Sequence, residues 1–329
     1  MLTTQPRLSD IILALNGIRP FIHKTPVLTS RFVNELAGNE VYFKCENFQK
    51  VGAFKIRGAT HAIQQLPEEL RSKGVATHSS GNHAQALALA ARIQKINAYI
   101  VMPETAPTIK RNAVIGYGGN IFNCKPTLEA REQTLEEVVR QTGAIVIHPY
   151  NNYDIIAGQA TCAYELLVEV PTLDAIIAPV GGGGLLSGTC LSAHYLNPFI
   201  EVFGSEPDGA ADASQSLQKG VIVPSVDPHT IADGLLTSLG DKTFPIIRDH
   251  VQRIILVNDQ EIISAMRILW ERLKIIVEPS GAVPLAALLH EKEYFKNRKV
   301  GVILSGGNAF SEPQVGQITL PSGQRRIAR

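Results

Sequence analysis

The stretch DAIIAPVGGGGLLSG (174–188) joins a short apolar run, four consecutive glycines and the start of a second apolar run. The first run, residues 174–180, is typical of a buried strand, and a helix is predicted from Leu185 onward. At such a turn glycine allows a close backbone approach, and a helix N-terminus favours an anion. A flexible turn is the alternative, but four glycines at this junction favour a phosphate site. We call these residues the glycine loop: Gly181, Gly182, Gly183 and Gly184.

Strand-like and helix-like segments alternate on both sides of this stretch, from about residue 41 to about residue 308. Short apolar strands with long intervening helices predict an α/β fold, with parallel sheets that helices cover on both faces. Residues 221–250 are richer in proline and less regular. The predicted strands are 41–46, 74–80, 98–103, 120–125, 144–149, 174–180, 199–207, 253–258 and a last one within 299–308. The predicted helices are 54–66, 82–94, 105–117, 127–143, 154–170, 185 onward, 210–219, 259–273 and 280–295.

The composition of the 329 residues is that of an ordinary globular protein, with 45% hydrophobic and 19% charged residues and a formal net charge of +1. A charge so close to zero gives no bulk attraction for nucleic acid or an anionic membrane. No apolar run reaches the roughly 18 residues of a membrane span, and the first residues lack a signal-peptide pattern. The four cysteines form no CxxC pair and are interpreted as reduced. We expect a cytoplasmic protein without nucleic-acid or membrane partners.

Two further loops follow predicted strands, where open parallel sheets bind their ligands. The loop of Ser79, Ser80, Gly81, Asn82 and His83 offers hydroxyls, an amide and backbone donors at a helix start, which suits a carboxylate. Plain N-capping is the alternative for this loop, and a lone histidine is more often structural than catalytic. The second loop, Ser305-Gly306-Gly307-Asn308, could equally be a tight turn.

Lys55 lies in the phrase GAFKIRG (52–58), at the start of a predicted helix. A lysine there opposes the helix dipole, and its neighbours Phe54 and Ile56 are apolar. Partial desolvation lowers the pKa of a lysine and makes it a nucleophile suited to Schiff bases. A surface lysine is the usual alternative, which the bracketing glycines make less attractive.

In this order the motifs resemble the serine/threonine dehydratase family of fold type II pyridoxal-phosphate enzymes, and within it the serine racemase-like branch. The SSGNH form is typical of dehydratases rather than of the related cysteine synthases. The resemblance implies a tryptophan synthase β-like fold of two open parallel-sheet domains with the cofactor in the cleft between them. The large cofactor-binding domain would comprise residues 1–70 and 152–329, and the small mobile domain residues 71–151. The matching stretches are 24–30, 44–59, 77–86, 156–161, 180–185, 231–234, 270–282 and 304–308.

The resemblance also implies roles for individual residues. Lys55 would carry pyridoxal 5'-phosphate as a Schiff base and move the Cα proton, and Ser80 would handle the proton on the opposite face. The remaining cofactor contacts would be Phe54, Asn82, Gly181, Gly182, Gly183, Gly184, Leu185 and Ser305. The substrate carboxylate would meet Ser79, Ser80, Gly81, Asn82, His83 and, as a second contact, Arg131.

The segment EPDGAAD (206–212) is similar to the cation site of the same branch. The resemblance implies a divalent cation bound by the side chains of Glu206 and Asp212 and the backbone carbonyl of Ala210. Oxygen-only ligands imply Mg²⁺ or Ca²⁺ rather than zinc. An acidic turn at a helix start, favoured by the dipole alone, is the alternative.

The implied activity is a dehydratase, or ammonia-lyase, that converts L-serine and L-threonine to a 2-oxo acid and ammonia and also racemises serine. Many family members have serine where this chain has Ala53, which leaves substrate choice open and makes threo-3-hydroxyaspartate the alternative substrate. A phosphate- or nucleotide-binding protein without turnover is the non-enzyme alternative. The missing GxGxxG disfavours a nicotinamide dehydrogenase. A homodimer is implied by the resemblance alone.

Overall fold

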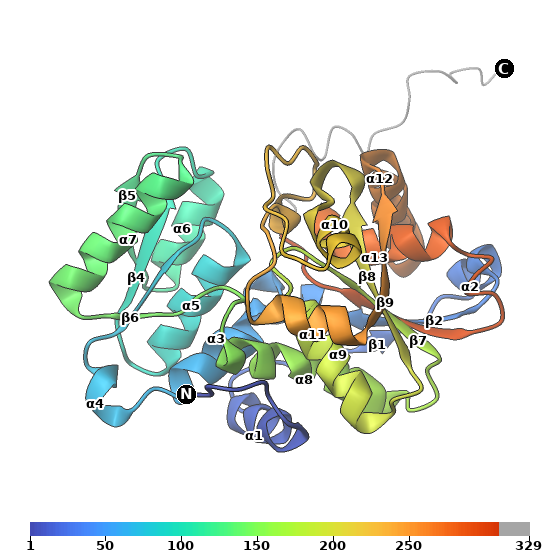
Figure 1. The fold of residues 1–329 in the computed structure, drawn as a ribbon, viewed down its shortest axis with the longest axis horizontal. Coiled ribbons are helices and arrows are strands. Elements are labelled where there is room, and N and C mark those ends of the chain that lie inside the picture. The colour runs from blue at the N-terminus through green and yellow to red at the C-terminus, as the bar shows by residue number, and fades with distance from the viewer. Residues whose placement is uncertain (309–329) are drawn as a thin grey trace, which may run out of the picture.

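The computed structural model describes residues 1–308, which form two sheets with helices packed around each (Figure 1). The larger sheet has the strand order β1-β2-β10-β7-β8-β9, and the smaller has the order β5-β4-β3-β6. Among the named strands of these residues, every pairing is parallel except that of β1 with β2. The predicted α/β fold with two parallel sheets is therefore confirmed. The strands are β1 (Val27–Leu28), β2 (Glu40–Cys45), β3 (Val75–His78), β4 (Ala98–Pro103), β5 (Asn120–Cys124), β6 (Ile145–Val146), β7 (Ala175–Pro179), β8 (Glu201–Pro207), β9 (Val251–Val257) and β10 (Lys299–Leu304).

The helices connect successive strands and cover both faces of the sheets. In the part of the chain that the structure describes, no helix is both long and apolar enough to cross a membrane. The α-helices are α1 (Leu8–Ile18), α2 (Arg31–Ala37), α3 (Lys55–Gln64), α4 (Glu68–Arg71), α5 (Asn82–Ile93), α6 (Thr108–Gly116), α7 (Leu128–Thr142), α8 (Tyr153–Glu169), α9 (Gly184–Leu196), α10 (Asp212–Lys219), α11 (Thr243–His250), α12 (Asp259–Ile268) and α13 (Pro279–His290).

The two sheets divide the chain unevenly. All four strands of the smaller sheet come from one continuous stretch, residues 75–146, and this unit stands apart on the left of Figure 1. The larger sheet takes two strands from before this stretch and four from after it. The domain boundaries at residues 71 and 151, and the mobility of the smaller unit, remain predictions.

Several elements differ from the expectation. The edge strand β1 is antiparallel and only two residues long, too short to leave a periodic pattern. Residues 243–250, in the proline-rich segment, form α11. Pro245 does not interrupt this helix, because it lies in the first turn, where proline is tolerated. The helix expected over 259–273 ends as α12 at Ile268 and continues as a π-helix, η5 (Leu269–Leu273).

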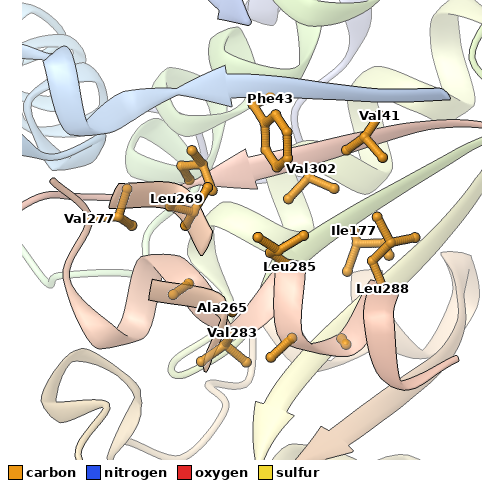
Figure 2. Close-up of a cluster of buried hydrophobic side chains, with 14 of the residues drawn as sticks. Val41, Phe43, Ile177, Ala265, Leu269, Val277, Val283, Leu285, Leu288 and Val302 are labelled. Carbon is orange, nitrogen blue, oxygen red and sulfur yellow. The ribbon is translucent and has the colours of Figure 1, made fainter. Parts of the chain in front are cut away.

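Alternate residues of the central strand β7 enter different hydrophobic cores, as expected for a strand with helices on both faces. Ala175 and Ile177 join the core made with α12 and α13, whereas Ile176 and Ala178 join the core made with α8 and α9. Figure 2 shows the first of these cores, in which the sheet faces α13. Residues 279–288 of α13 are all buried, so this helix is enclosed by protein on almost every side.

Helix α3 lies directly against α8 through two glycines. A Cβ on Gly158 would lie 2.6 Å from the Cα of Gly58, so no larger residue fits at this crossing. The backbone N–H of Gly58 also donates to Oε1 of Gln159 at 3.1 Å. Because Lys55 is the first residue of α3, this tight crossing determines where its side chain begins.

Candidate active site

A cavity lies beyond the carboxyl ends of β7 and β10, where an open parallel sheet places its ligands. Lys55, Asn82, the glycine loop and Ser305, which are far apart in the sequence, all line it. The remaining lining residues are Phe54, Tyr150, Pro179, Leu185, Gly234, Leu235, Thr237, Glu278 and Ser280.

Lys55 begins α3, and its ammonium group faces the cavity. Its Nζ donates a hydrogen bond to the carbonyl of Pro149 at 3.0 Å and lies 5.1 Å from the centre of the Phe54 ring. The backbone N–H of Phe54 donates to the carbonyl of Ser305 at 3.0 Å, which ties the lysine segment to the turn after β10. Burial lowers the pKa of Lys55 to about 8, although the nearby Glu278 carboxylate opposes the shift. The lysine can therefore lose its proton far more readily than a surface lysine.

The glycine loop is a turn that larger residues would fill. A Cβ on Gly182 would lie 2.2 Å from Cδ1 of Tyr150, and Gly183 has a left-handed φ of 88°. Among residues 1–308, no acceptor is hydrogen-bonded to the backbone N–H groups of the four glycines. These N–H groups lie at the N-terminus of α9, whose dipole favours an anion. The loop therefore has the shape and donors that a phosphate group requires.

The loop before α5 contributes less to the cavity than the sequence suggested. Asn82 lines it, and its Nδ2 donates to Oε1 of Glu278 at 2.9 Å. His83 is buried, with Nε2 3.1 Å from the carbonyl of Ile147, and burial lowers its pKa to about 3. A neutral histidine held in this way fits a structural role.

Five residues predicted to bind the substrate do not line the cavity. Arg131, on α7, is half-buried, and its Nε has no hydrogen-bond partner among the described residues. Ser79 accepts a hydrogen bond from the backbone N–H of Gly81 at 3.3 Å, within the turn. A role in carboxylate binding stays a prediction for Ser79, Ser80, Gly81, His83 and Arg131.

Seven lining residues were not predicted as site residues, and Glu278 and Tyr150 are two of them. Glu278 lies in the EPSGA stretch, which matches the family, but its sequence context offered no reason to assign this residue a role of its own. Tyr150 follows β6 closely, and its ring packs edge-to-face on His148 at 4.6 Å. The signal available for Tyr150 was its place just beyond a predicted parallel strand.

Two of the three predicted cation ligands, Asp212 and Ala210, line a second cavity beside α10, whereas Glu206 is not among its lining residues. Glu206, at the end of β8, accepts hydrogen bonds from the N–H groups of Ala213 and Ser214 at 3.0 Å each, and burial raises its pKa to about 8. Asp212 is buried, and neither of its carboxylate oxygens has a partner among residues 1–308. Burial raises the pKa of Asp212 to about 6, although the hydroxyl of Ser225 nearby opposes the shift. Ala210 lines the same cavity.

The described residues contain no group of three or more His, Cys, Asp or Glu side chains arranged to hold a metal ion. The predicted ligand set has only two such side chains, together with one backbone carbonyl.

Three comparisons with known proteins all point to enzymes that depend on pyridoxal phosphate. The sequence profile of the family described as pyridoxal-phosphate dependent enzyme matches residues 18–306. A serine racemase of Dictyostelium discoideum is 54% identical over 92% of this chain and 94% of its own length. An L-threo-3-hydroxyaspartate ammonia-lyase of Saccharomyces cerevisiae is 49% identical over 92% of this chain and 93% of its own. The crystal structure of the Dictyostelium discoideum serine racemase covers 93% of this chain and 99% of its own, with a TM-score of 0.89 and 53% identity.

Proposed function

Because the chain belongs to the family of pyridoxal-phosphate dependent enzymes, we propose that it is a hydroxy-amino-acid ammonia-lyase that also racemises serine. It would convert L-serine and L-threonine to a 2-oxo acid and ammonia. The observation that carries the proposal is the meeting of Lys55, Asn82, Ser305 and the glycine loop in one cavity. Relatives named serine racemase and hydroxyaspartate ammonia-lyase, both near 50% identity, support the same reaction classes.

The lining residues fit pyridoxal phosphate. Lys55 would hold it covalently through Nζ, and the unpaired N–H groups of the glycine loop would bind its phosphate. Asn82, Phe54, Leu185 and Ser305 would surround its ring. When bound, the cofactor supplies an electron sink that weakens the bonds at the substrate Cα.

The chain's own groups would handle protons on both faces of the substrate. With a pKa of about 8, Lys55 is partly neutral near physiological pH, so its amine can accept the Cα proton as a general base. Ser305, just beyond β10, would face the ring nitrogen with a neutral hydroxyl, which favours protonation of that nitrogen less than a carboxylate would. With a neutral partner at the ring nitrogen, the cofactor would stabilise the negative charge on the substrate Cα less well, which favours prompt loss of the β-hydroxyl. Ser80 would return a proton to the opposite face.

The proposal is tested by turnover of the purified protein. Keto-acid and ammonia release are measured with L-serine, L-threonine and threo-3-hydroxyaspartate, and D-serine formation is followed in parallel. Release from serine or threonine is expected, together with D-serine. Release from hydroxyaspartate alone would instead establish the second candidate, which the yeast relative and Ala53 favour. No turnover with any of these substrates would overturn both.

Ser80→Ala is expected to lower serine racemisation by about 10²- to 10⁴-fold, the usual contribution of one general acid or base. Elimination needs no proton on the second face, so ammonia release should change by less than about tenfold. Both rates are measured on the same preparation with L-serine. An equal loss of the two activities would contradict the assignment of Ser80 to the second face.

We also propose that Glu206, Asp212 and the carbonyl of Ala210 bind Mg²⁺ or Ca²⁺. The supporting observation is the pair of unpaired carboxylate oxygens on buried Asp212, which a cation would satisfy. Asp208, in the same turn, is exposed and provides a matched control.

Mg²⁺ is expected to raise the melting temperature by about 5 °C. Asp212→Asn should abolish this shift, whereas Asp208→Asn should keep it. Because the folded-state pKa values of Asp212 and Glu206 are raised to about 6 and about 8, the metal-free protein should lose stability as pH rises through this range. Mg²⁺ should suppress that loss in a melting series from pH 5 to 8, and an unchanged series would contradict the site.

We propose a homodimer on the ground of large apolar side chains that are exposed on the larger unit. Phe48, Trp270 and Ile276 are each at least 44% exposed, and Nδ2 of Asn47 donates to the carbonyl of Ile276 at 3.0 Å, which holds two of these segments together. Covering large exposed apolar groups is a common reason for association. Light scattering on the purified protein measures the mass directly. The cytoplasmic location stays a prediction.

A further inference from the structure

A buried carboxylate, that of Glu278, lies in the cavity at the start of α13. Only 6% of this residue is exposed. Its Oε1 accepts from Nδ2 of Asn82 at 2.9 Å, and its Oε2 accepts from the backbone N–H of Asn308 at 3.1 Å. Neither the glycine loop nor Lys55 requires an acid here, so the carboxylate needs an explanation of its own.

The hydrogen bonds give the Asn82 amide a defined orientation. Nδ2 of Asn308 donates to the carbonyl of Val51 at 2.7 Å and to Oδ1 of Asn82 at 2.8 Å. A backbone carbonyl can only accept, so the Asn308 nitrogen must face it, and the Asn82 atom beside that nitrogen must be oxygen. The Asn82 nitrogen then faces Glu278. It carries two hydrogens, of which Glu278 takes one, and the second remains for the cavity that Asn82 lines.

We propose that Glu278 is a positioning residue for the reaction, and that its carboxylate fixes the Asn82 amide with one N–H available to the cofactor and substrate. The inference rests on the proposed function. Both neighbours of the carboxylate are donors, so both of its oxygens must accept. A glutamine in this place would turn an NH₂ group toward one of the two donors. The site therefore requires an acid rather than an amide of the same shape.

The charges around Glu278 make its protonation sensitive near neutral pH. Burial and, to a lesser extent, the carboxylate of Asp233, in the turn η4 (Asp233–Leu235), raise its pKa to about 7. The hydrogen bonds from Asn82 and Asn308 and the charge of Lys110 on α6 oppose the shift. The folded-state pKa is raised, so the ionised acceptor that the amide network uses forms fully only above about pH 7.

The test uses the holoenzyme and its Glu278→Gln variant, with the exposed Glu293→Gln as the control. We expect Glu278→Gln to lower kcat by about tenfold to a hundredfold, the loss typical of a misplaced group, with little change in KM. Its cofactor absorbance should lose the pH dependence centred near 7, and its Kd for pyridoxal phosphate should rise. Glu293→Gln should match the wild type throughout.

Asn308→Ala attacks the same network from its other end and protects the test against a folding defect in Glu278→Gln. It should reproduce the change in absorbance and affinity. The double variant, Glu278→Gln with Asn308→Ala, should bind and use the cofactor no less well than the more impaired of the two single variants. The effects should not add, because both residues act through one amide. Wild-type absorbance, pH dependence and Kd in Glu278→Gln would overturn the inference while leaving the proposed function intact. Wild-type protein that binds no pyridoxal phosphate would overturn both.

Discussion

Lys55→Ala is expected to abolish ammonia release and serine racemisation together, with a fall in kcat of about 10⁴-fold or more, because one residue serves as both covalent anchor and general base. No other lysine lines the cavity in the part of the chain that the structure describes, so no second amine can replace it. The pKa of about 8 makes the wild-type amine available near neutral pH. Above that value the wild-type rate should level off, since the amine is then neutral.

The measurement combines turnover with a covalent readout. Wild-type protein incubated with pyridoxal phosphate and reduced with borohydride should gain the mass of one cofactor on the peptide that contains Lys55. Lys55→Ala should gain none, whereas Lys292→Ala, which removes an exposed lysine, should behave as the wild type. Turnover retained by Lys55→Ala would refute the whole scheme.

The sequence was most informative where a local pattern has a local cause. The boundaries of α5 and β4 lie within one residue of the expectation, because helix and strand periodicities are properties of neighbouring residues. The glycine loop could be predicted as a phosphate site for the same reason, because four consecutive glycines between a strand and a helix have few structural uses. Its contact with the Tyr150 ring could not be predicted, because that contact joins segments about 30 residues apart in the sequence.

The missed features of the site are long-range. The Glu278 carboxylate meets Asn82 across 196 residues of sequence and Asn308 across 30, so its environment could not be inferred from its neighbours. The proposed substrate loop is the converse case. Its composition suggested a ligand site, but only Asn82 reaches the cavity, and the turn uses the Ser79 hydroxyl internally.

The burial of Arg57 could not be predicted, because nothing in its sequence context indicates that this side chain is fully buried. Its Nε and Nη2 contact the two carboxylate oxygens of Glu46 at 2.7 and 2.8 Å. Its Nη1 and Nη2 contact Glu165 at 3.1 and 2.8 Å. Lys44 donates to the same Glu165 at 2.7 Å. Two positive and two negative side chains thus balance inside the protein, two residues along α3 from Lys55.

Arg57→Met is expected to lower the free energy of unfolding by about 3–5 kcal/mol, because removing one partner leaves a buried charge uncompensated. Urea denaturation at pH 7 measures the change. The control is Arg267→Met, which breaks an exposed pair with Glu271 at 2.6 Å and should cost about 0.5 kcal/mol or less. A loss as small as that of the control would mean that the buried cluster contributes little to stability.

The pH dependence of the same variant provides an independent check. Burial raises the pKa of Glu46, but Arg57, together with Lys44 and Thr25, lowers it by more, so the wild-type pKa lies below its usual value. The wild type therefore keeps this stability above the unfolded pKa and loses it as pH falls through the folded pKa. In Arg57→Met the pKa of Glu46 should instead rise, so acid neutralises the unpaired carboxylate. The stability difference between the two proteins should then shrink from pH 7 toward pH 5, and a difference that grows on acidification would contradict the role assigned to Arg57.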